Sequence, residues 1–169
     1  MFDVLQRGLI EDGSDAVLVS LSSAVVRCAV KGGVRTMGIL GTGMTMRSTG
    51  ATAFYRKKLA EKNIEAVFLQ NENDRDELDE LIRRKLVSDQ GSFTIENANL
   101  VVEFVKKLEL ESGNNCLDAV ALACTELPML LEKHRLVDHQ HSPPTLMGTR
   151  IRLIDTVQAL IDDALVALQ

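Results

Sequence analysis

The chain has 169 residues, of which 46% are hydrophobic and 25% charged, with a formal net charge of −5. This is the composition of one globular domain, or at most two small lobes, and its core must be aliphatic because Trp is absent and aromatic residues make up 4%. No basic stripe suits nucleic acid, and no apolar run has the ~18 to 20 residues of a membrane span, so we expect neither a nucleic acid nor a membrane as partner.

Both the N-terminus and the cysteine usage indicate the compartment. Residues 1–15 carry early acidic residues and lack the layout of a signal peptide, so we expect a cytoplasmic protein. Cys28, Cys116 and Cys124 are an odd number of cysteines in a mid-sized chain. Free thiols in a reducing compartment explain them better than a disulfide framework does.

Short apolar runs alternate with longer segments of helical periodicity. Runs this short and continuously apolar are typical of strands covered on both faces. The helical segment 74–87 has acidic residues early and basic residues late, which complements the helix dipole, and Asp155 is placed to cap the last helix. The predicted strands cover 15–20, 36–41, 64–70, 117–124 and 149–154, and the predicted helices cover 49–62, 74–87, 95–110 and 155–168.

This alternation predicts an α/β fold, a three-layer parallel sheet with helices on both faces. Ligands in such folds bind beyond the carboxyl ends of the strands. Two predicted strands end in residues suited to chemistry, Gly41 to Gly43 after the second strand and Cys124 after the fourth. The segment 138–148, which contains two Pro and a Gly, is predicted to be an irregular loop.

The stretch LDAVALACTELPML, residues 117–130, places Cys124 at the end of an apolar run, with a short loop expected at Pro128. The first amides of a following helix would favour a reactive thiolate there. Thr125 can donate a hydrogen bond to a carboxylate ligand, and Glu126 can orient an ammonium group. Spacing alone favours the alternative that this cysteine is only a small buried hydrophobe.

The stretch GILGTGMTM, residues 38–46, is a Gly-rich turn between a predicted strand and helix. Its glycine order matches neither the dinucleotide fingerprint nor the phosphate loop. Backbone amides and the hydroxyls of Thr42 and Thr45 either hold a carboxylate or belong to an ordinary tight turn.

No metal site is expected. The pair His139 and His141 has a spacing that can bind metal on a strand, but it lies in a Pro-rich segment that we expect to be a solvated loop. The cysteines other than Cys124 lie outside any zinc spacing. The acidic run 71–80 is predicted to be a loop and a solvated helix start.

Two stretches of the chain resemble each other. SDAVLVSLSS at 14–23 aligns with LDAVALACTE at 117–126, which places Leu21 opposite Cys124 and Ser22 opposite Thr125. Either the match is chance, or it marks two related strand–loop units whose loops could face one another.

Four motifs in this order, GILGTGMTM, FYRKKLAEKNIEAVF, DAVALACTELPML and RLIDTVQAL, resemble the aspartate/glutamate racemase family, in the branch closer to aspartate racemases. The resemblance covers roughly residues 13–169, and C-T-E-L-P is its most specific part. It implies catalysis without pyridoxal phosphate, metal or other cofactor, in which one cysteine removes the α-proton of an acidic amino acid and a second returns one from the opposite face. It assigns catalysis to Cys124 and substrate binding to Thr42, Thr45, Thr125 and Glu126.

The chain departs from this family at the first cysteine. The family motif resembles G-A-D-x-x-x-x-P-C-N-T-A-H, and residues 13–25 have Leu21 in place of its cysteine. The opening units of the family's first lobe also have no counterpart. We therefore expect a truncated homologue, with 1–36 a remnant of the first lobe, 37–150 the second lobe and 151–169 a helix returning toward the remnant.

Two functions fit these departures. The first is a racemase-like protein with lost or reduced activity, because a leucine side chain cannot transfer a proton. The second is a non-catalytic interaction, regulatory or effector module derived from a racemase. In either case a missing lobe would expose apolar surface, so we expect a homo-oligomer.

Overall fold

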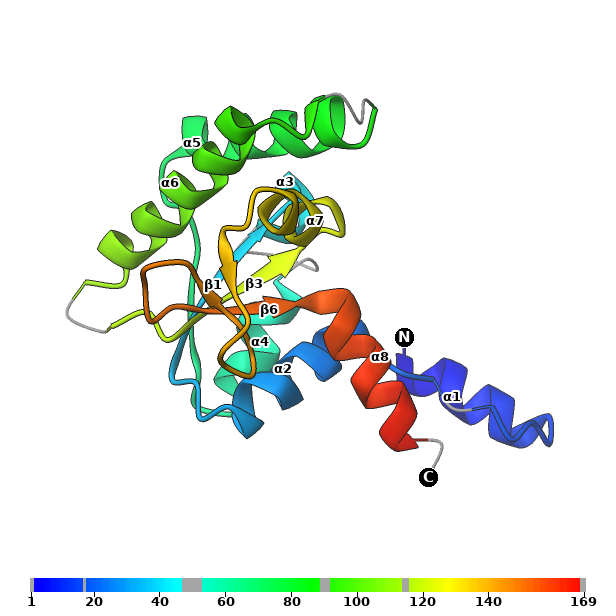
Figure 1. The fold of residues 1–169 in the computed structure, drawn as a ribbon. Coiled ribbons are helices and arrows are strands. Elements are labelled where there is room, and N and C mark those ends of the chain that lie inside the picture. The colour runs from blue at the N-terminus through cyan, green and yellow to red at the C-terminus, as the bar shows by residue number, and fades with distance from the viewer. Residues whose placement is uncertain (1, 17, 47–52, 89–91, 114–115, 168–169) are drawn as a thin grey trace.

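The computed structural model describes residues 2–16, 18–46, 53–88, 92–113 and 116–167 (Figure 1). These residues contain a sheet with the strand order β2-β1-β3-β6-β5-β4. The strands are β1 Thr36–Gly41, β2 Glu65–Val67, β3 Ala119–Ala123, β4 Val137–Asp138, β5 Thr145–Leu146 and β6 Arg152–Asp155. The helices are α1 Phe2–Glu11, α2 Leu21–Lys31, α3 Gly43–Met46, α4 Phe54–Ala60, α5 Glu72–Glu80, the π-helical η2 Leu81–Leu86, α6 Ile95–Glu111, α7 Glu126–Lys133 and α8 Thr156–Ala167.

The predicted α/β fold is confirmed, with a sheet that is mixed rather than wholly parallel. Strands β2, β1, β3 and β6 are parallel to one another, while β5 pairs antiparallel with both β6 and β4. The antiparallel pair β4–β5 lies partly in 138–148, which was predicted to be an irregular loop. Strands this short carry too few residues for an alternating pattern to be recognised in the sequence.

The central strands are buried on both faces, as their continuous apolar runs predicted. Every residue of β1 is buried, and alternate residues belong to two different cores. Met37 and Ile39 pack on one side and Leu40 on the other. Gly38 lets α6 approach closely, because a Cβ there would lie 2.7 Å from Leu108 Cδ1.

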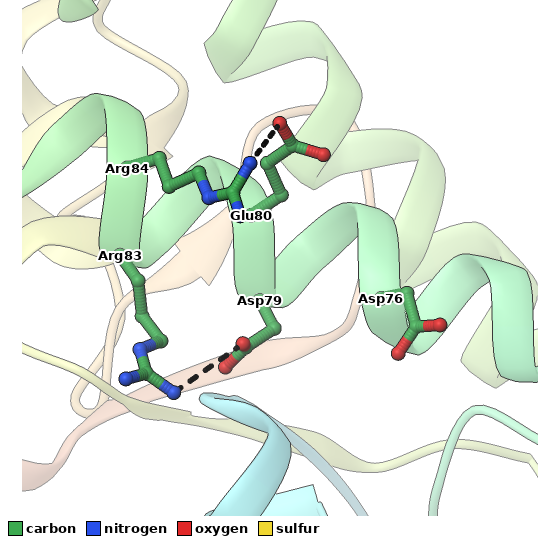
Figure 2. A pocket seen from close by; sticks show the side chains of 5 residues that line it. All are labelled: Asp76, Asp79, Glu80, Arg83 and Arg84. Carbon is green, nitrogen blue, oxygen red and sulfur yellow. Dashed lines mark ion pairs between the residues drawn. The ribbon is translucent and has the colours of Figure 1, made fainter.

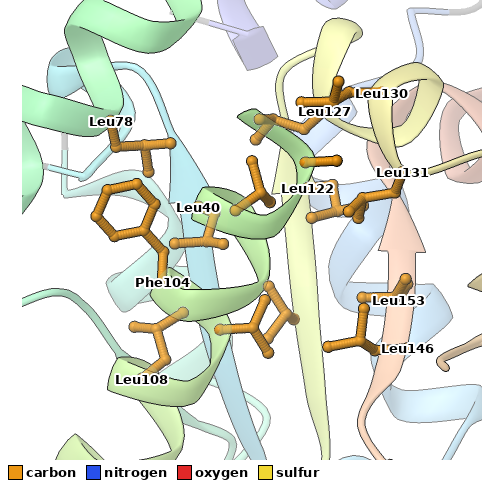
Figure 3. Packing of buried hydrophobic residues seen from close by; sticks show 14 of the residues in the cluster. Leu40, Leu78, Phe104, Leu108, Leu122, Leu127, Leu130, Leu131, Leu146 and Leu153 are labelled. Carbon is orange, nitrogen blue, oxygen red and sulfur yellow. The ribbon is translucent and has the colours of Figure 1, made fainter. Parts of the chain in front are cut away.

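One helical layer covers each face of the sheet. Helices α2, α4 and α8 contribute to the core on one face, and α5, η2, α6 and α7 contribute to the core on the other. Figure 3 shows part of the second core, where Leu40 and Leu122 of the sheet meet Phe104 of α6 and Leu127 of α7.

The strand predicted at 15–20 is not formed by the residues of that range that the structure describes. Residues 14–16 and 18–20 have no regular secondary structure, and the first strand of the sheet begins at Thr36. A strand requires a neighbour with which to share a ladder of hydrogen bonds, and the order of this sheet places no strand beside the segment. The segment instead leads into α2, whose N-cap is Ser20.

The helices largely confirm the sequence predictions. Helix α6 begins at Ile95 as expected, and Asp155 caps α8 by accepting the backbone N–H of Val157 at 2.8 Å. The helix expected at 74–87 begins earlier, after the N-cap Asn71, and continues as η2. Of the helix expected at 49–62, the structure shows Phe54–Ala60, and residues 49–52 lie outside the described part.

Candidate active site

The carboxyl ends of β1 and β3 bring together the two segments that the sequence singled out. Gly41 is in register with Ala123, so Thr42 and Cys124 are the next residues beyond two adjacent strands. A Cβ on Gly41 would lie 3.2 Å from the Cβ atoms of both Ala123 and Thr45. The glycine therefore allows the Gly-Thr turn to pack against the end of β3.

The predicted binding residues differ in their surroundings. The hydroxyl oxygens of Thr42 and Thr45 lie 3.4 Å apart, and both residues are half-buried. Thr125 is exposed at the N-cap position of α7, where its side chain makes no capping bond. Glu126, the first residue of α7, is half-buried. The loop expected at Pro128 is wrong, because this proline lies in the first turn of α7, where its missing N–H leaves no bond unmade.

Cys124 is held as a neutral thiol. Its Sγ donates a hydrogen bond to Glu126 Oε2 at 2.6 Å. Burial and this bond to a carboxylate raise the pKa of Cys124 to about 12, and the backbone amides of Glu126 and Thr125 oppose them less strongly. The expectation that the helix start would favour a thiolate is therefore wrong for this state of the protein, because burial and a nearby carboxylate outweigh the helix dipole.

The pKa of the Glu126 carboxyl group is shifted in the opposite direction, below its ordinary value. Burial raises the pKa of Glu126, but hydrogen bonds from the Cys124 thiol, the Thr125 side chain and the backbone together lower it. The pair therefore consists of a thiol and a carboxylate at neutral pH. Such a pair can accept a hydrogen bond at the Glu126 carboxylate and offer a proton from Cys124.

The amides of the Gly-Thr turn are already occupied. Gly43 N–H donates to Asp79 Oδ1 at 2.6 Å, and the N–H groups of Thr45 and Met46 donate to the Thr42 carbonyl at 2.8 and 3.0 Å. The Asp79 carboxylate thus accepts the hydrogen bond of the Gly43 amide, a group that the sequence analysis considered as a donor to a ligand carboxylate. The hydroxyls of Thr42 and Thr45 lie 3.4 Å apart, within hydrogen-bond distance of each other.

The contact between Asp79 and the Gly-Thr turn was not predicted from the sequence. Asp79 lines a charged hollow together with Asp76, Glu80, Arg83 and Arg84, and Figure 2 shows Asp79 and Arg83 directed toward one another. The Asp79–Arg83 pair is 3.8 Å long and has the helical i,i+4 spacing. That spacing is visible in the sequence, but nothing local in the acidic run 71–80 indicates a bond to Gly43.

Leu21 lies at the same edge of the sheet as Cys124. Arg152, the first residue of β6, donates to the carbonyl of Gly32 just beyond the end of α2. Helix α2 therefore runs antiparallel to β6, and its first residue, Leu21, is at the carboxyl edge. Leu21 is 41% exposed there. The two echoing segments thus both lead into helices at one edge, although among their described residues only the second contains a strand.

The remaining candidates take structural positions. His139 pairs with Glu132 at 3.0 Å on the surface, and His134 bonds the Phe93 carbonyl at 3.0 Å. Within the described ranges, no cluster of three His, Cys, Asp or Glu residues is placed to hold a metal ion, and the three cysteines are free. None of the helices in that part of the chain has the length and apolar content of a membrane span.

The sequence profile of Asp/Glu/Hydantoin racemases matches residues 8–164, which is most of the chain. The chain belongs to this family. The family membership predicted from the C-T-E-L-P and Gly-Thr motifs is thereby confirmed. A comparison with curated proteins gives no match.

Two solved racemase-family structures are similar over nearly the whole chain. An aspartate racemase homologue from Pyrococcus horikoshii OT3 is 24% identical, with a TM-score of 0.69, over 98% of this chain and 62% of that one. A Yersinia pestis protein assigned to the Asp/Glu racemases is 25% identical, with a TM-score of 0.68, over 95% of this chain and 60% of that one. The chain thus spans about three fifths of the length of these structures.

Proposed function

We propose that this racemase-family chain binds a small acidic amino acid beside Cys124 but does not invert it as two-cysteine members do. Inversion requires an acid and a base on opposite sides of the α-carbon. The observation that carries the proposal is Leu21, an alkyl side chain at the carboxyl edge where the family motif has its first cysteine. Without a second thiol, protons can be exchanged from one face only.

The residues around Cys124 support an amino-acid ligand. The hydroxyls of Thr42, Thr45 and Thr125 can donate to carboxylate oxygens, and the carboxylate of Glu126 can accept bonds from an ammonium group. These are the groups that an amino acid needs, and none of the proposed roles requires a metal or an organic cofactor. Cytoplasmic location, and the division into 1–36, 37–150 and 151–169, belong to the same proposal.

The resting protonation state makes Cys124 an acid rather than a base. With a pKa of about 12, roughly one molecule in 10⁵ carries the thiolate at pH 7. The nearest acceptor, Glu126, has a lowered pKa and takes the proton unfavourably. Removal of an α-proton by Cys124 is therefore slow unless the bound ammonium of the substrate first engages Glu126 and frees the sulfur from its hydrogen bond.

The test is to incubate the protein with L- or D-aspartate, and separately with glutamate, in deuterated water. Ligand binding is measured by calorimetry, α-deuteration by NMR and handedness by chiral chromatography. We expect binding, with any deuteration confined to one enantiomer with retention and no mirror-image product. Cys124→Ser should abolish that exchange, whereas Cys116→Ser, at an exposed free thiol, should not. Racemisation at a rate typical of the family would contradict the proposal that inversion is impaired. Absence of binding would contradict the proposal that the ligand is a small acidic amino acid.

A non-catalytic interaction module is the second candidate function. The observation that favours it is the apolar surface of α8, where Ile161 is 47% and Leu165 57% exposed. A protein that acts through such a surface needs no proton transfer at Cys124. If the protein does not bind aspartate or glutamate in the experiment above but does self-associate, this candidate is favoured over the first.

A further inference from the structure

A hollow of about 390 Å³ lies between α7 and the half of the sheet that contains β3, β6 and β4. This volume is within the range of small-molecule sites in proteins, near its lower end. Its lining comes from these elements and from Pro144, the residue before β5, and it includes neither Cys124 nor the threonines of the Gly-Thr turn. This α7 hollow is therefore distinct from the candidate active site.

Most of the α7 hollow is apolar. Leu122 of β3 and Leu153 of β6 line it, and both are buried side chains on the face of the sheet that α7 covers (Figure 3). Pro128 and Glu132, four residues apart, also line it, so one face of α7 is turned toward the hollow. Met129 on this face is 60% exposed, and its flexible thioether can adapt to an apolar ligand.

Two carboxylates line the same hollow without a lysine or arginine partner. Among the ion pairs of the described residues, none joins Glu132 or Asp155 to Lys or Arg. Glu132 Oε2 bonds the ring of His139 at 3.0 Å, and Asp155 Oδ1 accepts the amide of Val157 at 2.8 Å. The second oxygen of each carboxylate, Glu132 Oε1 and Asp155 Oδ2, has no hydrogen bond to the part of the chain that the structure describes.

The one lysine of the lining is directed to a different partner. Lys133 Nζ lies over the ring of Phe93, 5.9 Å from its centroid, and Phe93 does not line the hollow. A cation–π contact with a neutral ring leaves the charge of the two carboxylates uncompensated. The α7 hollow thus combines apolar walls with an excess of negative charge, which is complementary to an apolar molecule that carries a positive charge.

We propose that the α7 hollow binds a small organic cation, a primary ammonium on a compact apolar body. The apolar body packs against Leu122, Leu153 and Met129, and the ammonium donates to the free oxygens of Glu132 and Asp155. Hydrogen bonds from an ammonium to a carboxylate are roughly twice as strong as those between neutral groups. An acidic amino acid carries two carboxylates and is disfavoured here by the same charges, so this site is independent of the ligand proposed beside Cys124.

The proposal is tested by following the backbone amides of the full chain by NMR while one of three probes of similar shape is added. The probes are phenethylamine, which is a cation, phenethyl alcohol, which is neutral, and hydrocinnamate, which is an anion. We expect phenethylamine to shift the amides of Leu122, Met129 and Leu153 and to bind about tenfold more tightly than the alcohol. Hydrocinnamate should bind most weakly of the three.

Two variants separate the charge of the α7 hollow from its apolar walls. Glu132→Gln should weaken binding of phenethylamine by about tenfold and leave that of phenethyl alcohol unchanged. Met129→Ala should weaken the binding of both probes by a similar factor. The matched control is Glu61→Gln, which makes the same change of charge at the exposed C-cap of α4, on the opposite face of the sheet, and should leave both affinities as they are.

Circular dichroism verifies that each variant is folded, which we expect of Glu132→Gln because this side chain is 47% exposed. Where a variant fails to fold, the comparison of the three probes on the parent chain decides. Equal affinity for the amine and the alcohol overturns the proposal, as does tighter binding of hydrocinnamate. So does an equal loss in Glu61→Gln and Glu132→Gln, or competition by aspartate, which would place the amine beside Cys124.

Discussion

The two echoing segments, 14–23 and 117–126, reach the same edge of the sheet with different results. The second forms β3, paired on both sides by β1 and β6, and presents a thiol bonded to a carboxylate. The first forms no strand in its described residues and presents Leu21. Similar residues, S-D-A-V and L-D-A-V, therefore become a strand only where the sheet supplies neighbours for their backbone groups.

Leu21 and Cys124 have similar positions in the fold but differ in side-chain chemistry. Helices α2 and α7 both begin at the carboxyl edge of the sheet. Only Cys124 has both an ionisable proton and a partner that controls it. Under the proposed function, the two positions share an edge of the sheet but not the chemistry that a two-cysteine racemase needs.

The largest expected effect comes from restoring the missing thiol. Leu21→Cys should give racemisation of aspartate or glutamate that is at least about 100-fold above the parent, because a positioned acid or base typically contributes 10²- to 10⁴-fold. Mirror-image product is measured by chiral chromatography. The gain must disappear in the double variant that also carries Cys124→Ser.

The matched control for this gain is Ser22→Cys, since Ser22 is the next residue but is buried. A thiol at 22 should give no gain. Equal activity of the two variants would show that any added thiol suffices, and the comparison between Leu21 and Cys124 would lose its basis.

A second large effect compares the stability of the same two regions. Leu122→Ala in β3 should lower the free energy of unfolding by ~2 to 5 kcal/mol, because Leu122 is 2% exposed in the core. Leu18→Ala, in the segment without a strand, should lower it by less than ~1 kcal/mol, because Leu18 is only half-buried. Urea unfolding at equilibrium measures both. Equal losses would show that the first segment belongs to the cooperative core.

Local patterns in the sequence predicted the parts of the fold that are themselves local. The stripe of α6 has one strongly buried side, and Asp155 precedes an apolar helix, so both helices could be placed from neighbouring residues. The motif around Cys124 likewise gave the end of β3 and the residues beside it. These features depend on contacts within a few positions along the chain.

Features that depend on distant contacts were not predictable in this way. The bond between Asp79 and Gly43 joins residues 36 positions apart, and the acidic run around Asp79 has the composition of a solvated helix. The neutral state of Cys124 results from burial in the folded chain together with the rotamer of Glu126. The exposure of Ile161, 47% of its surface, follows from which face of α8 meets the sheet.

A smaller effect concerns the protonation of Cys124. Glu126→Gln removes the carboxylate that helps to raise the pKa of the thiol, so the pKa should fall and more thiolate should be present at any given pH. Burial, the larger cause, remains, so alkylation of Cys124 by iodoacetamide at pH 9 should accelerate by less than about tenfold, which corresponds to one pKa unit. Mass spectrometry of the modified peptide follows the rate, with exposed Cys116 as the internal reference. Slower alkylation than in the parent would contradict a carboxylate acting against the thiolate.

The smallest expected effect tests how the Gly-Thr turn is held. Asp79→Ala removes the acceptor of the Gly43 N–H and should lower the free energy of unfolding by ~1 to 2 kcal/mol, whereas Asp79→Asn keeps an acceptor oxygen and should lower it by less. Hydrogen exchange at the Gly43 amide should accelerate in the same order. Asp76→Ala, in the same charged hollow, is the control and should leave this amide protected. If both alanine variants expose Gly43 equally, the hollow as a whole, rather than the bond from Asp79, holds Thr42 and Thr45 near Cys124.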